Sequence, residues 1–156
     1  MNAYGYVDRS KLKIIKTKPD DKDLVSHWVT HWNRHAENRA HMPEPICSDT
    51  GGELAFAFQE FGRLWRFDWC IPEAWVAVEV DGGNRMVRRT KKGLLVPVGR
   101  HTKDEDMWKG NSAVQLGWFV FTFTPAMMKL DPILCVQMVE KRVRLNLAQL
   151  YRGVIK

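Results

Sequence analysis

Two different spacings of hydrophobic residues alternate along the chain. Between residues 22 and 40, apolar side chains recur every three or four positions, which predicts an amphipathic helix. Three shorter runs follow at residues 53–59, 64–71 and 74–81, and their β-branched and aromatic residues predict strands. The third run is apolar almost throughout, which is typical of a strand that is covered on both faces in the middle of a sheet.

The second half of the chain continues this alternation. The basic stretch 84–100 contains two glycines and a proline, which predict a long loop or an irregular hairpin. A capping box at Thr102–Glu105 opens a predicted helix that Gly117 ends. Residues 118–123 predict another buried strand, and residues 132–147 predict a closing helix.

This order of elements predicts an α/β fold in which helices flank a small mixed β-sheet. The length of 156 residues suits a single domain, 1–156. Residues 1–20 are polar and basic and predict an N-terminal arm, and residues 42–52 predict a loop. The elements between residues 53 and 128 form the predicted core of the domain.

Composition narrows the classes of protein to which the chain can belong. Hydrophobic residues make up 45% of it and charged residues 27%, which excludes collagen-like and wholly disordered chains. No apolar run approaches the roughly 20 residues of a membrane-spanning helix. The first 18 residues carry charges where a secretory signal would be apolar, so we expect a soluble, cytoplasmic protein without a membrane partner. The wide spacing of Cys47, Cys70 and Cys135 argues against a disulfide framework or a thiolate zinc site.

Positive charge is concentrated in one segment. The formal net charge of the chain is +6, yet the segment 84–103 has seven basic residues and no acidic one. Clustered cations can neutralise several phosphates, whereas a scattered excess mainly improves solubility. We therefore treat these side chains as candidate DNA contacts, although a solvated basic loop would have the same composition. They are Arg85, Arg88, Arg89, Lys91, Lys92, Arg100 and Lys103.

Acidic residues lie in two neighbouring predicted strands. Asp68 lies in the second run, and Glu79 and Asp81 close the third. Because only a short turn separates the two runs, we expect them to pair as a hairpin and bring their acidic ends together, with Glu79 and Asp81 on one face. Carboxylates from adjacent strands form an oxygen site that suits Mg²⁺ or Mn²⁺, and such an ion stabilises charge on a phosphate during hydrolysis. The alternative is that these carboxylates only accept hydrogen bonds from turn amides.

Lys109 is the candidate cation for this acidic site. In the predicted helix it lies about 40° around the axis from Ala113, so we expect its side chain to face the sheet. There the ammonium group could orient a water or stabilise charge on a phosphate. Alternatively, the side chain runs along the surface and pairs with Asp106.

Three histidines form a stripe on the predicted helix 22–40. His27, His31 and His35 are four residues apart, and side chains with this spacing share a helix face and can hold a metal. No acidic or thiol residue accompanies them, which favours a polar, partly exposed face instead.

Several short motifs occur in the order that is found in one family of enzymes. This series, which lies within about residues 53–128, resembles the small phage and prophage nucleases of the PD-(D/E)XK superfamily. The resemblance implies a restriction-endonuclease-like fold and a Mg²⁺-dependent DNA endonuclease that acts in the cytoplasm of a host cell. The motifs are Arg66-Phe67-Asp68, Val78-Glu79-Val80-Asp81-Gly82-Gly83, Gly99-Arg100-His101-Thr102, Asp106-x-x-Lys109-x-Asn111-x-Ala113, Gly117-Trp118 and Phe123-Thr124.

The resemblance also implies roles for individual residues. Asp68 and Glu79 would hold the metal, with the carbonyl of Val80 as a further ligand. The family has a lysine two residues after the second acid, where this chain has Asp81. We therefore assign the water-activating role to Lys109 and treat Asp81 as a candidate third ligand.

Two further sites follow from the same resemblance. Glu53 corresponds to an outlying acidic ligand, for which Glu60 is a competing choice. Arg100 and His101 match the family's Gly-Arg-His-Thr motif, and they are candidates for phosphate contact or for proton transfer to the leaving oxygen.

The substrate is inferred from what the chain lacks and from its size. No helix-turn-helix or zinc module for reading bases is visible, which favours recognition of DNA structure over a long sequence. Two symmetric cuts in a junction would require a homodimer, for which Trp28, Trp32 and Phe119 are candidate interface residues. The hypothesis is therefore an endonuclease of branched DNA that resolves Holliday junctions. Its alternatives are a mismatch, nicking or non-selective endonuclease and a DNA-binding module without catalytic activity.

Overall fold

The central sheet is mixed and has four strands. The computed structural model describes residues 7–16, 22–58, 63–82, 87–97 and 103–154. Within them β5 pairs with β6 in antiparallel orientation, and β6 pairs with β9 in parallel orientation. Strand β6 has a partner on each side, as its almost wholly apolar sequence predicts. The order of the strands is β2 (Ile46–Cys47), β5 (Trp69–Ile71), β6 (Val76–Val80) and β9 (Phe119–Phe123).

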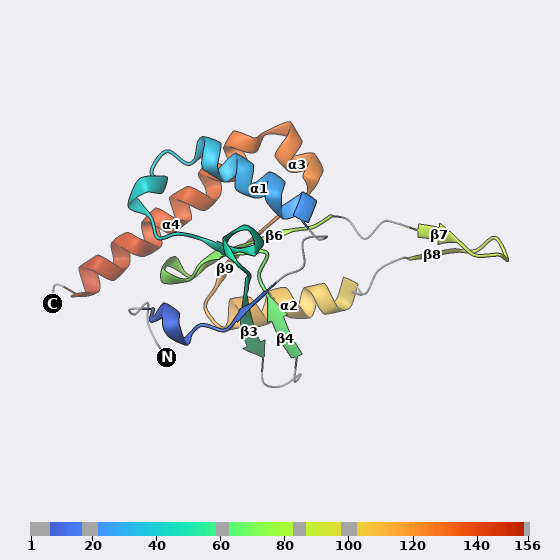
Figure 1. The fold of residues 1–156 in the computed structure, drawn as a ribbon, viewed down its shortest axis with the longest axis horizontal. Helices are drawn as coiled ribbons and strands as arrows, with labels where there is room; N and C mark the ends of the chain where they lie inside the picture. Colours follow the sequence, from blue (N-terminus) through green and yellow to red (C-terminus); the bar gives the residue numbers. More distant parts are fainter. Residues whose placement is uncertain (1–6, 17–21, 59–62, 83–86, 98–102, 155–156) are drawn as a thin grey trace.

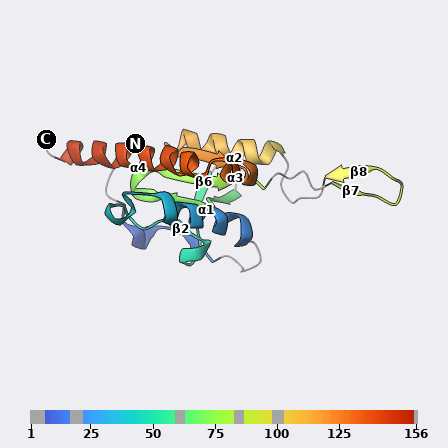
Figure 2. The same cartoon turned by 90° about the horizontal axis from the view of Figure 1, so that it is seen from above.

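A second sheet and a separate hairpin complete the strands of the described residues. In the second sheet, β3 lies between β1 and β4, and both pairings are antiparallel. Strands β7 and β8 pair only with each other and project from the rest of the molecule (Figures 1 and 2). The strands are β1 (Ile14–Ile15), β3 (Glu53–Phe58), β4 (Arg63–Arg66), β7 (Val87–Arg89) and β8 (Leu95–Pro97).

Helices cover both faces of the central sheet. They are α1 (Lys22–His35), α2 (Lys103–Gln115), α3 (Pro125–Leu130) and α4 (Pro132–Val154). The class is therefore α/β, as predicted. None of the helices in the described ranges is long and apolar enough to cross a membrane.

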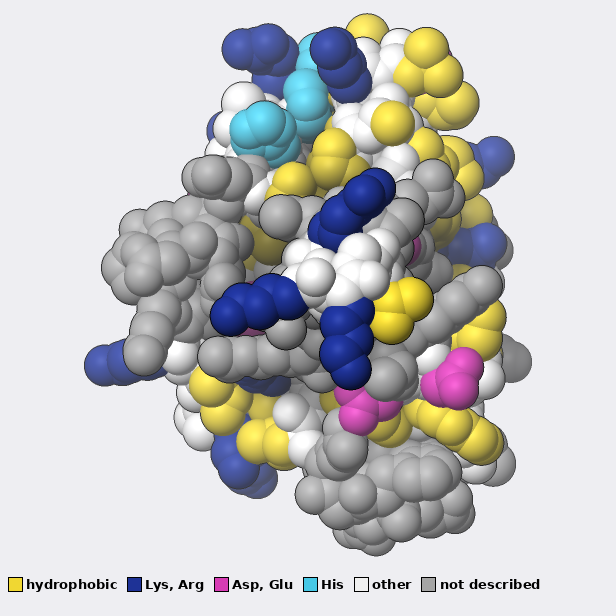
Figure 3. Space-filling view, turned by 90° about the vertical axis from the view of Figure 1, so that its right-hand side faces the viewer, with side chains coloured by type: hydrophobic (Ala, Val, Ile, Leu, Met, Phe, Trp, Pro, Cys, Tyr) yellow, Lys and Arg dark blue, Asp and Glu magenta, His cyan; other side chains and the backbone are white. Residues whose placement is uncertain are grey.

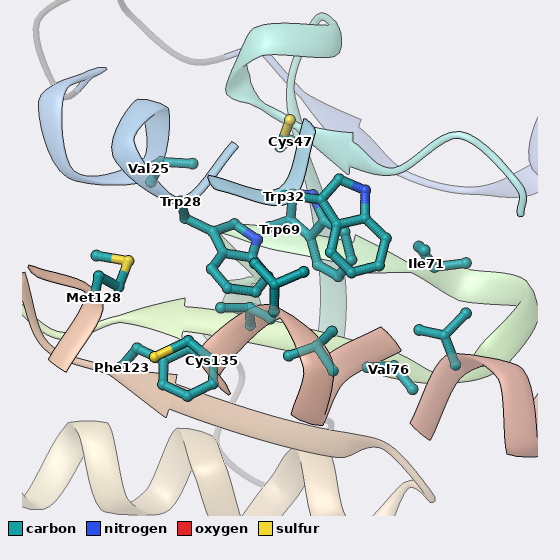
Figure 4. Packing of buried hydrophobic residues seen from close by; sticks show 14 of the residues in the cluster. Val25, Trp28, Trp32, Cys47, Trp69, Ile71, Val76, Phe123, Met128 and Cys135 are labelled. Atoms are coloured by element: carbon teal, nitrogen blue, oxygen red, sulfur yellow. The ribbon is translucent and has the colours of Figure 1, made fainter. Parts of the chain in front are cut away.

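The larger core lies between the central sheet, α1 and α4 (Figure 4). Val76 and Val78 of β6 are fully buried on this face. Trp28 and Trp32 of α1 contact Trp69 of β5, with ring centroids 5.6 and 4.8 Å from it. These rings bury large apolar surfaces, which is a major source of stability in a chain of this size.

A smaller core lies on the opposite face of the same sheet. It joins Ala77 of β6 and Cys70 of β5 to Phe56 of β3 and to Ala113 of α2. Strand alternation explains the division, because Ala77 lies between two valines that face the larger core. Helix α2 therefore covers the face of β6 that bears Ala77.

The end of α2 follows the local sequence. Gly117 has a φ of +96°, and its N–H donates to the Val114 carbonyl at 3.0 Å. The N–H of Trp118 donates to the Ala113 carbonyl, also at 3.0 Å. This pair of bonds is a Schellman motif, so the prediction that Gly117 ends the helix is confirmed. The predicted capping residue Thr102 lies outside the described residues.

The predicted strand 64–71 is wrong as a single element. The structure divides it into β4 and β5, which belong to different sheets. The N–H of Phe67 still bonds to the Leu54 carbonyl of β3 at 3.0 Å, but Asp68 directs its side chain to β6. A local run of apolar residues does not reveal such an exchange of partner strands.

Other boundaries also change. The helix predicted at 22–40 ends at His35, and the one predicted at 132–147 continues to Val154. The helix α3 was not predicted, although Thr124 accepts a hydrogen bond from the Met127 N–H as its N-cap. The predicted arm 1–20 contains β1, and the predicted loop 42–52 contains β2, because both short strands depend on pairing with distant residues.

The structure contradicts two of the three predicted dimer-interface residues. Trp28 and Trp32 are completely buried in the larger core, so neither is available to a second copy of the chain. Phe119 is partly buried, and the guanidinium of Arg142 lies 4.4 Å from its ring centroid. The homodimer itself stays a prediction.

Candidate active site

Asp68 lies where the chain passes from one sheet to the other. Strand β4 before it pairs with β3, and strand β5 after it pairs with β2 and β6. Its Oδ2 atom accepts a hydrogen bond from the Val80 N–H at 2.8 Å. The carboxylate is thereby fixed at the last residue of β6.

Glu79 lies on the face of β6 that α2 covers. It is two residues after Ala77 and therefore shares its side of the strand. Its side chain is 21% exposed, and its Oε1 atom is buried without a hydrogen-bond partner in the described part of the chain. A buried carboxylate oxygen without a partner is uncommon, because desolvation of the charge is costly.

Lys109 reaches the same point from α2. Its Nζ atom donates to Glu79 Oε2 at 2.5 Å, and its side chain is 20% exposed. Ala113, one turn later on the helix, lies in the smaller core, so this face of α2 points to the sheet. The predicted direction of Lys109 is confirmed, and its bond to Glu79 replaces the alternative of a surface pair with Asp106.

Burial perturbs the pKa of both carboxyl groups, and Asp68 also acts on Glu79. Burial raises the pKa of Glu79 to about 8, and the charge of Asp68 adds to that rise, while Lys109 opposes it. Burial also raises the pKa of Asp68, against the effects of Lys109, the Val80 N–H and Arg66. Two adjacent carboxyl groups with raised pKa values form an environment that an additional cation would stabilise.

The residues present fit a hard divalent cation. Asp68 and Glu79 supply carboxylate oxygens, and Glu79 Oε1 is buried without a hydrogen-bond partner among the described residues. No group of three or more His, Cys, Asp or Glu side chains that could hold a metal exists among the described residues. Two carboxylates with a backbone carbonyl and water match the way in which Mg²⁺ is usually bound, since it rarely occupies an all-protein cage. The carbonyl of Val80 stays the predicted backbone ligand.

Glu53 and Asp81 do not complete a three-carboxylate group. Glu53 lies at the start of β3 and forms an ion pair with Arg66, with Oε2 and Nε 3.5 Å apart. Asp81 follows β6, its side chain is exposed, and its N–H donates to the Phe123 carbonyl at 2.9 Å. The competing residue Glu60 lies outside the described residues.

Two charged residues act on Asp68 although the sequence did not assign them this role. Arg66 lowers the pKa of Asp68, and Asp106 raises it. Arg66 is two residues before Asp68, and Asp106 is one helical turn before Lys109. Both belong to the motifs quoted above, and their spacing from Asp68 and Lys109 is the signal that could have identified them.

The predicted DNA-contacting residues are only partly described. Arg89, Lys91 and Lys92 are exposed on the hairpin of β7 and β8. The backbone of Arg88 belongs to β7, and that of Lys103 begins α2. Arg85, Arg100 and His101 lie outside the described residues, so their roles stay predictions.

The histidine stripe is separate from this site. His31 and His35 lie on α1 with ring centroids 6.1 Å apart, and α1 packs on the opposite face of the central sheet from α2. Burial, together with the charges of His35, Arg34 and His27, lowers the pKa of His31. The stripe is therefore no part of the carboxylate site.

Comparisons with known proteins give no relative of this chain. No family model matches it, and neither a curated protein nor a solved structure does so. Its function is therefore inferred from the motifs in the sequence and from the geometry around Asp68, Glu79 and Lys109.

Proposed function

We propose that this protein is a metal-dependent DNA endonuclease and that branched DNA is its preferred substrate. The observation that supports this most strongly is the position of two largely buried carboxyl groups beside one lysine. Asp68 lies between β4 and β5 and Glu79 lies in β6, yet burial raises the pKa of both, and the charge of Asp68 raises that of Glu79 further. Burying two like charges side by side destabilises the folded state. A contribution to stability therefore does not explain why these two carboxyl groups lie together.

The proposed ion is Mg²⁺ or Mn²⁺, held by Asp68, Glu79 and the carbonyl of Val80. When bound, it would supply charge neutralisation at the phosphate and make a nearby water more acidic. Lys109, with its ammonium 2.5 Å from Glu79 Oε2, is positioned to donate a hydrogen bond to an attacking water or to a phosphate oxygen. Hydrolysis adds one water and breaks one phosphorus–oxygen bond, so one DNA end retains the phosphate and the other gains a hydroxyl.

Arginine and lysine side chains outside the carboxylate site support a nucleic acid as the substrate. Arg66 lies near Asp68, and Arg89, Lys91 and Lys92 are exposed on the projecting hairpin. Lysine and arginine contacts to phosphates supply affinity without sequence information. Recognition by shape then favours a branched substrate, and two symmetric cuts in a junction require two copies of the chain.

The test compares three labelled DNA substrates in Mg²⁺ and in chelator: a four-way junction, a linear duplex of the same sequence and a single strand. We expect metal-dependent, paired cuts in the junction. Glu79→Gln should lower the cleavage rate by at least about a hundredfold. The matched control is Glu37→Gln, which makes the same change at an exposed residue outside the site and should leave the rate unchanged.

A second measurement separates metal binding from catalysis. Mg²⁺ should raise the melting temperature of the wild-type protein but not that of Glu79→Gln, because a ligand stabilises only a folded state that binds it. Equal cleavage by wild type and Glu79→Gln would contradict the assignment of Glu79. Tight binding of all three DNAs without any cleavage would instead favour a DNA-binding module, and cleavage of all three would remove the preference for branches.

A further inference from the structure

The hairpin of β7 and β8 has a fixed turn at its tip. The Thr90 N–H donates to the Leu94 carbonyl at 2.8 Å, and the Gly93 N–H donates to the Thr90 carbonyl at 2.8 Å. The Thr90 hydroxyl also accepts from the Leu94 N–H at 3.1 Å. Gly93 has a φ of +78°, a conformation that a side chain would disfavour. The turn therefore holds Leu94 in a defined position by its own backbone.

The side chains at this tip have an unusual combination of properties. Arg89, Lys91 and Lys92 are exposed, and residues 87–97 include no acidic residue. Leu94 stands among them with 64% of its surface exposed. Figure 3 looks onto the end of the molecule from which the hairpin projects, and Lys and Arg side chains spread outward there. A two-stranded hairpin is at best marginally stable alone, so an exposed leucine at its tip contributes little to folding.

The connections of the hairpin join it to the active site. The chain enters it after β6, which bears Glu79, and leaves it before α2, which bears Lys109. Because five residues of chain span at most about 18 Å, the base of the hairpin lies within that distance of Gly82, which follows β6. The hairpin is therefore a projecting element within reach of a substrate that has one phosphate at the carboxylates.

We propose that this hairpin enters a groove of DNA at a branch point and inserts Leu94 between unstacked bases. The proposal rests on the proposed function in taking DNA as the substrate. Two-stranded ribbons bind in either groove of DNA, and apolar side chains such as leucine serve as wedges between base steps when they enter from the minor groove. Arg89, Lys91 and Lys92 would bind the flanking phosphates.

Insertion of Leu94 would explain why the protein prefers branched DNA to a continuous duplex. A wedge must first separate stacked bases in a continuous duplex, and this unstacking costs free energy. At a branch point the stacking is already interrupted, so the same contact requires less distortion. Leu94 would therefore select the branched structure, while the surrounding cations bind any DNA.

The experiment measures the fluorescence of 2-aminopurine at the branch point of a four-way junction, in chelator so that no cleavage occurs. We expect the wild-type protein to increase the fluorescence and Leu94→Ala to lose that increase. Leu94→Ala should also lower the preference for junction over duplex by about tenfold, which is the effect of burying one leucine. Leu130→Ala is the matched control, because Leu130 is 87% exposed on α3, away from the hairpin, and should behave as wild type.

A triple variant with alanine at Arg89, Lys91 and Lys92 tests the other half of the proposal. It should bind junction and duplex more weakly alike and reduce the salt dependence of binding, with a slope change of about 0.9 for each phosphate contact that is lost. Melting curves should be unchanged in all these variants because the side chains are exposed.

Several outcomes would overturn insertion. These are an unchanged fluorescence signal in Leu94→Ala, or Leu94-dependent binding to anionic vesicles without a DNA signal. An equal signal from a four-way RNA junction would overturn DNA as the specific partner of the hairpin. If Leu94→Ala cleaved the junction and kept the full preference for junction over duplex, the insertion proposal would be wrong and the nuclease proposal would stand. Fluorescence that depends on Leu94, together with no cleavage of any DNA in Mg²⁺, would support insertion and refute the nuclease.

Discussion

The two faces of β6 share one backbone and carry opposite chemistry. On one face, Val76 and Val78 are fully buried against α1 and α4. On the other face, Ala77 is followed by Glu79, which bonds to Lys109 of α2. The first face is a uniform apolar contact, while the second changes from apolar to charged within two residues.

This difference shows how a small chain combines a stable core with a buried charged site. Burial of the valines and of the tryptophans around them stabilises the strand. The same rigid strand then holds Glu79 where burial raises its pKa to about 8. The charged face lowers stability in the absence of a cation, and the apolar face compensates for that loss.

Replacement of Lys109 by methionine should have the largest effect. The change keeps the length of the side chain and removes the charge that Glu79 Oε2 contacts at 2.5 Å. We expect the cleavage rate of a four-way junction to fall by about 10²–10³-fold, because a donor aimed at developing charge is lost. Single-turnover cleavage in Mg²⁺ measures this.

The control for that variant is Lys129→Met on α3, which makes the same change at an exposed position. It should cleave as the wild type does. If Lys109→Met cleaved at a rate within a factor of about three of wild type, the loss of rate would be far smaller than a donor of this kind should cause. Lys109 would then have no part in the proposed mechanism.

The charged face was predictable in outline because its signals are local. The acidic end of an apolar strand identified Glu79, and helical geometry directed Lys109 to the sheet. The position of Asp68 at the exchange between two sheets was not predictable, since it depends on which strands pair. For the same reason the ion pair of Glu53 with Arg66 was missed, because it joins residues of two different strands.

The pH dependence of stability should show the next largest effect, in a metal-free solution. An unfolded Glu79 ionises near its ordinary pKa of 4.5, whereas in the folded protein its pKa is about 8. Between these values the folded state binds more protons, so stability falls as the pH rises. Relative to Glu79→Gln, the wild type should lose about 2 kcal/mol of unfolding free energy between pH 5 and pH 7.

Urea unfolding of both proteins at the two pH values measures that difference. Comparison with the glutamine variant cancels the contributions of other titrating groups. If the two proteins lost stability in parallel, the carboxyl group of Glu79 would not be held in a buried environment. A smaller difference after addition of Mg²⁺ is expected, because a cation favours the ionised form.

The smallest effect should come from the apolar face, with Val76→Ala. Val76 is completely buried, three residues before Glu79 and on the other side of the strand. Loss of its two methyl groups should lower the unfolding free energy by about 1.6 kcal/mol, or somewhat more if a cavity remains. Cleavage per folded molecule should be unchanged, since the backbone of β6 and its partners β5 and β9 still fix Glu79.

Urea unfolding and single-turnover cleavage of the same preparation measure both quantities. A loss of cleavage without a loss of stability would show that the two faces are coupled, and that the apolar side of β6 does more than support the strand.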